Sequence, residues 1–149
     1  MQDIRDFFVF DLICDGREIA TPLSVSSADK TSVPIHQFTA IWDPGATSSM
    51  ISADLARALQ LEPQGTVRVS GVHGVEDAKL YTISLIFNNG FTIDKLQVSE
   101  AGNNAGFDVL IGMDVISKGI FIVDGVNHSQ EGCQIAFAHP VGSNDSGNA

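Results

Sequence analysis

The chain has 149 residues, 44% of them hydrophobic and 17% charged, so we expect one folded domain with a sizeable core rather than a disordered chain. Eight basic and 18 acidic residues give a formal net charge of −10. This charge argues against nucleic acid and membranes as partners, because phosphate-rich surfaces attract clustered Lys and Arg. We assign the domain to residues 1–141 and predict a disordered tail over residues 142–149, which are rich in Ser, Asn and Gly.

Short apolar runs separated by turn residues predict a mostly β domain. We expect strands over residues 7–13, 19–25, 34–42, 66–69, 79–87, 91–98, 107–113, 119–123 and 133–138, with the last two completing the sheet. Asp15-Gly16 and Asn88-Asn89-Gly90 predict tight turns between neighbouring strands, the first as a hairpin.

Only two short helices are expected. The first follows Ser52, a suitable N-cap, carries Leu55 and Leu59 on one face, and ends before Pro63. The second begins at Asp114, which we interpret mainly as its capping residue.

The most informative segment is Asp43-Pro44-Gly45-Ala46-Thr47. An apolar strand leads directly into this segment, which places one carboxylate on a tight turn that contains glycine. Asp and Gly occupy many turns without any chemical role. The motif alone is therefore only suggestive of a catalytic acid.

Two further segments strengthen the interpretation. Residues 107–116 combine an apolar strand with Leu110, Ile111 and Gly112, followed by Asp114 and a short helix. Residues 69–75 contain two glycines and are typical of the tip of a hairpin.

Together these segments, in this order, resemble the retropepsin-like (retroviral-type) aspartic proteases, in particular single-domain bacterial and cellular members. The resemblance covers residues 33–125. It implies a closed β-barrel-type half-domain with one or two short helices that assembles as a symmetric homodimer. It also implies an enzyme that hydrolyses peptide bonds of extended polypeptides.

The resemblance implies a role for each motif. Asp43 would be catalytic and would meet Asp43 of a second subunit at the dimer axis, where the two carboxylates share one proton and activate a water. Substrate would contact the loop and the hairpin tip, or flap, through these residues: Gly45, Ala46, Thr47, Gly71, Val72, His73 and Gly74. Structural support would come from Pro44, Leu110, Ile111 and Gly112.

Pro44 departs from the family pattern, which has Thr or Ser after the catalytic Asp. In the family, the hydroxyl of that residue forms a hydrogen bond to the opposite subunit. Pro supplies neither a hydroxyl nor an N–H. Losing two such hydrogen bonds corresponds to about 1–3 kcal/mol of dimer stability. An alternative is therefore a catalytically impaired dimeric module that binds peptides, and a third possibility is an unrelated β domain in which the motifs are coincidental.

The sequence also gives expectations about metals, cofactors, cellular location and the terminal segments. The four His show no metal-ligand spacing, so we expect no metal and no cofactor. Cys14 and Cys133 form no redox motif, the first residues do not resemble a secretory signal, and a cytoplasmic protein is expected. We expect the terminal apolar segments, residues 7–13 and 133–138, to contribute a sheet between the two subunits.

Overall fold

The computed structural model describes residues 4–12, 18–28, 36–88, 90–125 and 133–140. The predicted turn at Asp15-Gly16, the cysteine at position 14 and the predicted tail over residues 142–149 lie outside these ranges. In the described part of the chain, no helix is long and apolar enough to cross a membrane.

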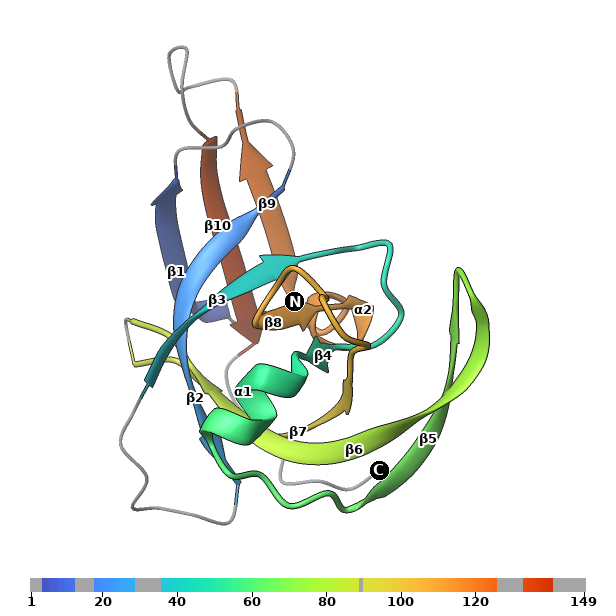
Figure 1. Ribbon diagram of the computed structural model, residues 1–149. Helices are drawn as coiled ribbons and strands as arrows, with labels where there is room; N and C mark the ends of the chain where they lie inside the picture. Colours follow the sequence, from blue (N-terminus) through green and yellow to red (C-terminus); the bar gives the residue numbers. More distant parts are fainter. Residues whose placement is uncertain (1–3, 13–17, 29–35, 89, 126–132, 141–149) are drawn as a thin grey trace.

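Strands dominate the structure, as the sequence predicts (Figure 1). They are β1 (Ile4–Leu12), β2 (Ala20–Ser27), β3 (His36–Trp42), β4 (Met50–Ile51), β5 (Gly65–Gly71), β6 (Gly74–Ile86), β7 (Thr92–Glu100), β8 (Val109–Ile111), β9 (Ile120–Asp124) and β10 (Cys133–Pro140). The described residues also form two short helices, α1 (Ala53–Ala58) and α2 (Met113–Ile116).

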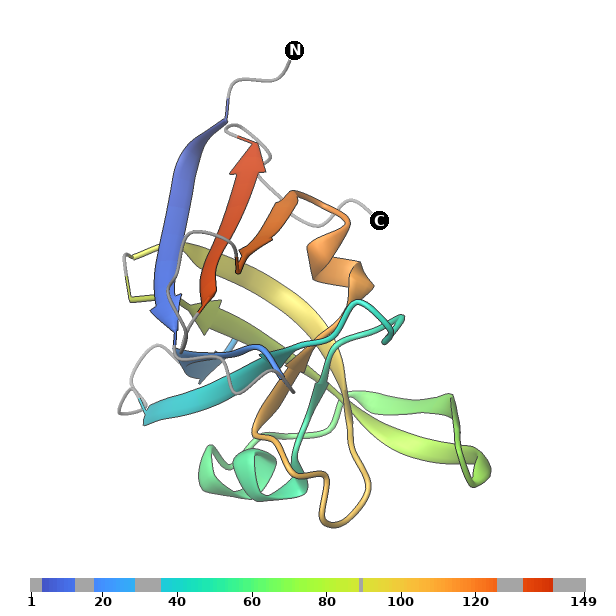
Figure 2. The same cartoon turned by 90° about the horizontal axis from the view of Figure 1, so that it is seen from above.

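The strands form two sheets. The larger has the order β2-β3-β8-β4-β7-β6-β5, and an additional pairing of β2 with β6 closes it into a barrel from which the β5–β6 hairpin extends. The smaller sheet has the order β1-β10-β9 and lies beside the barrel (Figure 2). The mostly β fold class expected from the sequence is thus confirmed.

The smaller sheet corrects two expectations. The strand β1 pairs with β10 at the other end of the chain, with Phe8 opposite Phe137, and it does not form a hairpin with β2. The strands β9 and β10 pair with each other and do not complete the larger sheet. Turn residues predict the first hairpin from local sequence, whereas the observed partner of β1 is a segment far away in the sequence.

An aromatic cluster joins the two sheets. Trp42, the last residue of β3, stacks on Phe121 of β9, with ring centroids 5.0 Å apart and an angle of 11° between the planes. Phe137 of β10 and Phe87 also contact the Trp42 ring. The indole N–H donates to Thr21 Oγ1 at 2.9 Å, so the polar end of this buried ring is satisfied. The strand that precedes Asp43 is therefore fixed in the core.

The helix α1 forms as the sequence predicts. Ser52 is its N-cap, and its hydroxyl accepts a hydrogen bond from Leu55 N at 3.1 Å. Leu55 and Leu59 are both buried in the core, and the segment beyond Pro63 leads into β5. By contrast, the N-cap of α2 is Gly112, and Asp114 lies inside the first turn. The interpretation of Asp114 as the capping residue is therefore wrong.

The end of β7 is held by a polar contact. The Tyr81 hydroxyl donates to Glu100 Oε1 at 2.9 Å. The pKa of Tyr81 is raised to about 12, mainly by burial and secondly by this hydrogen bond and the charge of Glu100. This contact fixes the start of residues 101–108, the loop that leads into β8.

Candidate active site

Asp43 lies at the start of a tight turn directly after β3. Ala46 N donates to Asp43 O at 3.1 Å, which closes a turn over residues 43–46. Pro44 occupies the second position of this turn, where its fixed φ angle is suitable. Gly45 N donates to Asp43 Oδ1 at 2.8 Å, so the turn also orients the carboxylate. Pro44 thus has a local role in shaping the turn.

The segment formed by β8 and α2 holds the Asp43 loop in place through backbone hydrogen bonds. Asp43 N donates to Ile111 O at 2.9 Å, Met113 N donates to Ala46 O at 2.8 Å, and Asp114 N donates to Thr47 O at 3.2 Å. Ile111 is fully buried, and Leu110 is half-buried. Backbone hydrogen bonds therefore hold both ends of the loop within one subunit.

Gly112 is required for this close approach. A Cβ atom at position 112 would lie 2.8 Å from the carbonyl carbon of Ser48 and 2.9 Å from Ala46 O. Both neighbours are backbone atoms that cannot rotate away. Glycine at position 112 therefore allows the segment formed by β8 and α2 to lie directly against the loop.

Ser49 and Asp114 form a connection that the sequence analysis missed. Ser49 N donates to Asp114 Oδ2 at 2.9 Å, and Ser49 Oγ donates to Asp114 Oδ1 at 2.7 Å. Ser49 Oγ in turn accepts from Gly112 N at 3.0 Å, and Ser49 is completely buried. A carboxylate that binds both donors of one residue fixes its position strongly. Asp114 therefore holds the end of the Asp43 loop onto α2.

The predicted hairpin tip is present between β5 and β6. Gly71 pairs with Gly74, and Val72 at the tip is 100% exposed. His73 is exposed as well. The hairpin curves so that its tip lies on the same side of the molecule as the loop over residues 43–49 (Figure 1). A Cβ atom at Gly71 or Gly74 would have no neighbour within 4 Å. The tip is therefore not packed against the loop.

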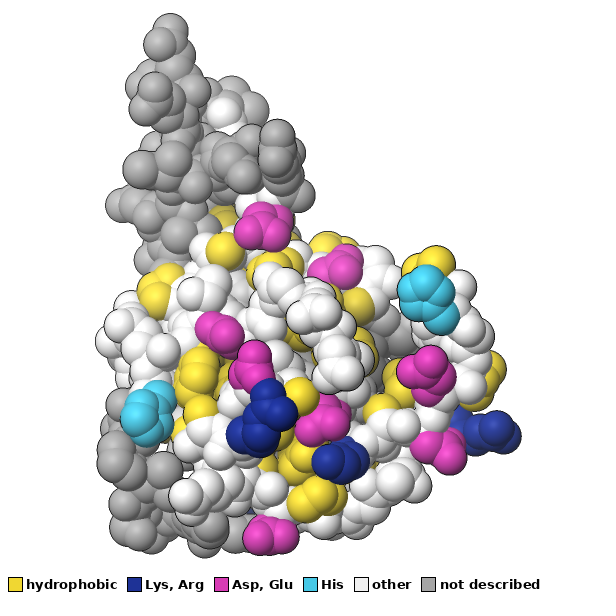
Figure 3. Space-filling model, viewed as in Figure 1, with side chains coloured by type: hydrophobic (Ala, Val, Ile, Leu, Met, Phe, Trp, Pro, Cys, Tyr) yellow, Lys and Arg dark blue, Asp and Glu magenta, His cyan; other side chains and the backbone are white. Residues whose placement is uncertain are grey.

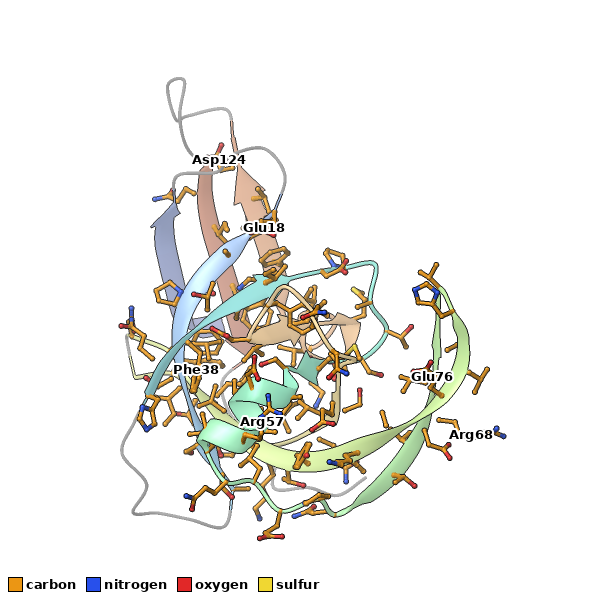
Figure 4. All side chains as sticks on the ribbon, in the orientation of Figure 1. Glu18, Phe38, Arg57, Arg68, Glu76 and Asp124 are labelled. Atoms are coloured by element: carbon orange, nitrogen blue, oxygen red, sulfur yellow. The ribbon has the colours of Figure 1, made fainter. Side chains whose placement is uncertain are left out.

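A cavity of about 760 Å³ separates the base of the hairpin from the loop. It is lined by Ser48 and Ser49 of the loop, by Val67 and Val69 of β5, and by residues of β7. Arg68 also borders this cavity, although Figure 4 shows its side chain pointing away from the body of the protein. Residues of the loop, of the hairpin and of β7 thus border one common space.

A second cavity, of about 500 Å³, lies between α1 and residues 102–108. Its lining includes Glu18 and Arg57, both labelled in Figure 4. Neither of the two cavities includes Asp43. Over the described part of the face in Figure 3, Lys and Arg side chains lie singly among acidic ones.

The neighbouring acids are engaged elsewhere. Asp108 Oδ2 accepts from Thr39 N at 3.0 Å, and Asp114 binds Ser49. Asp124 lies at the far end of β9 (Figure 4). The described residues contain no cluster of three or more His, Cys, Asp or Glu side chains that could bind a metal ion together. Among the described residues, the loop over residues 43–49 thus presents one oriented carboxylate, that of Asp43.

The comparisons with known proteins define the class of this domain. The aspartyl protease family matches residues 22–115, which is more than half of the chain and includes the Asp43 loop, the hairpin and Gly112. The chain belongs to this family. No curated protein sequence matches it.

Solved structures agree in fold. A crystal structure of a retropepsin-like aspartic protease from Rickettsia conorii is similar with a TM-score of 0.55 and 13% identity, over 93% of this chain and 97% of that one. The EIAV protease complexed with the inhibitor HBY-793 has a TM-score of 0.49 and 14% identity, over 69% of this chain and 88% of that one. The likeness to the Rickettsia structure confirms the retropepsin-like half-domain expected from the sequence as the fold.

Proposed function

We propose that this protein is a homodimeric aspartic endopeptidase that hydrolyses peptide bonds of extended polypeptides. The observation that carries the proposal is the Asp43 turn, in which Gly45 N orients the carboxylate while β8 and α2 hold the loop from below. The family match over residues 22–115 supports the same chemistry.

In this proposal, Asp43 of each subunit contributes one carboxylate to a pair at the two-fold axis. Two carboxylates about 3 Å apart share one proton, because both cannot be ionised at that distance. The ionised member takes a proton from a water that attacks the scissile carbonyl carbon, and the protonated member donates a hydrogen bond to the carbonyl oxygen. Collapse of the tetrahedral intermediate, with a proton passed to the amine, releases the two peptides.

The remaining predicted site residues take positional roles. Gly45, Ala46 and Thr47 contact the substrate beside Asp43. The tip from Gly71 to Gly74, including Val72 and His73, acts as a flap whose backbone pairs with an extended substrate. Support of the loop comes from Pro44, Leu110, Ile111 and Gly112. A cytoplasmic location stays a prediction.

Digestion of a denatured protein mixture tests the proposal. The purified protein is incubated with the mixture at several pH values between about 4 and 7, because the pH at which a carboxylate pair shares one proton differs between sites. New peptide termini are then identified by mass spectrometry. We expect cleavage within unfolded chains that the Asp43→Asn variant does not produce. Equal cleavage by both proteins would rule out the proposed mechanism.

One observation favours a second candidate, a dimeric peptide-binding module with impaired catalysis. Pro44 shapes the turn but carries no hydroxyl that could reach across a two-fold axis. Such a module would use the same hairpin and cavity to hold a peptide without cutting it.

Replacing Pro44 with Thr separates the two candidates. The new hydroxyl would add a hydrogen bond from each subunit, about 1–3 kcal/mol in total. Loss of proline lowers the free energy of unfolding of each subunit by about 0.4–1 kcal/mol but leaves the affinity between folded subunits unchanged. We expect a gain of about tenfold or more in dimer affinity and higher cleavage at low protein concentration. Sedimentation and peptide cleavage over a dilution series measure both effects. Peptide binding without cleavage by either protein would favour the binding module.

A further inference from the structure

Ser99 carries a buried hydroxyl that has no hydrogen-bond partner among the described residues. Ser99 lies near the end of β7 and is 5% exposed, and its Oγ atom is unpaired. Buried polar groups in folded proteins are nearly always hydrogen-bonded, so an exception requires an explanation. Two other buried serines do have partners, since Ser49 binds Asp114 and Ser52 caps α1.

The Ser99 side chain lies on the face of the sheet that borders the cavity between the hairpin and the Asp43 loop. Side chains alternate between the two faces of a strand. Val98 is buried in the core, whereas Gln97 and Ser99 line the cavity of about 760 Å³. On the neighbouring strand β6, Leu80 pairs with Ser99 and lines the cavity, and Tyr81 is buried in the core. The Ser99 hydroxyl therefore leaves the sheet on the cavity side.

This position connects Ser99 to both parts of the site that the proposed function assigns to substrate contact. Ser99 N donates to Ser49 O at 3.4 Å, so Ser99 lies next to the end of the Asp43 loop. Val67 and Val69 of β5 line the same cavity from the hairpin. Loop and hairpin tip lie on one side of the molecule (Figure 1). A polypeptide held between them would present a side chain to this cavity.

The charged residues around the cavity do not favour a charged ligand. Its described lining includes bases and acids, namely Arg68, Lys95, Lys118, Asp94 and Asp114. Asp114 is bound to Ser49, and Arg68 pairs with Asp77 at 3.6 Å. Charges of both signs thus border the cavity, so neither a carboxylate nor an ammonium group would meet only attractive neighbours. An uncharged polar group suits this lining better.

We infer that Ser99 is a specificity-determining residue that binds a carboxamide side chain, Asn or Gln, of the polypeptide. The inference rests on the proposed function, because the polypeptide reaches the cavity only when it is bound between loop and hairpin. A serine hydroxyl can donate and accept, and a carboxamide has one donor end and one acceptor end. Ligand pockets typically combine apolar walls with a few polar groups of this kind that provide specificity.

The unpaired hydroxyl gives the expected size of the preference. A carboxamide satisfies Ser99, whereas an apolar side chain of similar length, such as Met or Leu, leaves the hydroxyl buried and unpaired. We expect the wild type to prefer the carboxamide by about tenfold or more.

Cleavage of a peptide library by the full-length protein tests the inference. Peptides from a digested proteome are incubated with the wild type and with Ser99→Ala, and the cleavage sites are identified by mass spectrometry. At one position relative to the cleaved bond, we expect Asn and Gln to be enriched over Leu and Met by the wild type but not by Ser99→Ala. Ser84→Ala is the matched control, because Ser84 is 8% exposed, lies on β6 and lines neither of the two cavities.

Two synthetic peptides that differ only at that position, with Gln in one and Met in the other, distinguish specificity from a structural effect. Ser99→Ala should lower kcat/KM for the Gln peptide about tenfold and change that for the Met peptide less than about twofold. Its Tm should equal or exceed that of the wild type, because the substitution removes a buried group without a partner. Equal losses on both peptides, a clearly lower Tm, or a carboxamide preference that persists in Ser99→Ala would overturn the inference.

The outcome for Ser99 is separable from the outcome for the proposed function. If the wild type cleaves nothing, the same library is passed over immobilised wild-type and Ser99→Ala proteins, and the bound peptides are sequenced. Enrichment of peptides with Asn or Gln by the wild type alone would support the role of Ser99 while the protease function fails, and no enrichment would overturn it. Cleavage by the wild type without any carboxamide preference would support the protease function and overturn the role of Ser99.

Discussion

Replacing Asp43 with Asn is expected to lower kcat/KM for peptide cleavage by at least about ten-thousandfold, because both general acid–base groups of the dimer are lost at once. Asn cannot be ionised, so no group at this position can take the proton of the attacking water. The amide oxygen can still accept the hydrogen bond from Gly45 N, which Asp43 Oδ1 accepts at 2.8 Å. The fold should therefore remain intact.

Cleavage of a fluorogenic peptide derived from an observed cleavage site measures this effect. Asp54→Asn is a suitable control, because Asp54 is an exposed acid that pairs with Arg57 on α1. The control should retain the wild-type rate, and both variants should unfold at the wild-type temperature. An Asp43→Asn variant with wild-type activity would place the chemistry on another residue.

Replacing Asp114 with Ala should destabilise the protein by about 3 kcal/mol and reduce cleavage in parallel. The substitution leaves the N–H and the hydroxyl of buried Ser49 without the carboxylate that binds them at 2.9 and 2.7 Å, and each buried unsatisfied group costs about 1–3 kcal/mol. The loop that carries Asp43 would then be less firmly attached to α2. Denaturant unfolding and peptide cleavage measure the two consequences.

The comparison of three variants distinguishes a positioning role from a general loss of stability. Asp114→Asn keeps one acceptor for Ser49 and should lie between wild type and Asp114→Ala in both measurements. Asp54→Ala removes an exposed ion pair and should change the free energy of unfolding by less than about 1 kcal/mol. If Asp114→Ala proved as stable and active as Asp54→Ala, the connection through Ser49 would have no role in holding the loop.

Local signals in the sequence predicted those parts of the structure that local interactions determine. Ser52 identified the start of α1, because a side-chain cap needs only the next turn of the chain. The two glycines at 71 and 74 identified a hairpin tip, and Gly112 marked a close approach of two backbones. The order of these features along the chain was sufficient to predict the fold class.

Contacts between distant segments were not predictable in the same way. The two-residue strand β4 exists only because β7 and β8 flank it. The strand β1 pairs with β10, more than 120 residues away, and not with β2, the next strand along the chain. An acidic residue next to a helix, such as Asp114, predicts a helix cap. Its hydrogen-bond partner Ser49, however, lies 65 residues earlier in the chain. Sequence spacing alone does not reveal such a pair.

Pro44 shows how a departure from a family pattern can have a local explanation. The sequence alone indicates only that a hydroxyl and an N–H are missing at this position. The hydrogen bond from Ala46 N to Asp43 O shows that Pro44 occupies a turn position suited to proline. The missing hydroxyl at position 44 is thus accompanied by a residue that makes the turn more rigid.

Mixing wild-type and Asp43→Asn subunits tests most directly the claim that two copies of Asp43 form one active site. The two proteins are combined above the dissociation constant, allowed to exchange subunits, and assayed for peptide cleavage. Since a mixed dimer has one catalytic Asp, activity per wild-type subunit should fall to about half at equal amounts and to about a tenth with a ninefold excess of the variant. Activity that remains constant at every excess would contradict the account, because it would mean that one subunit holds a complete active site.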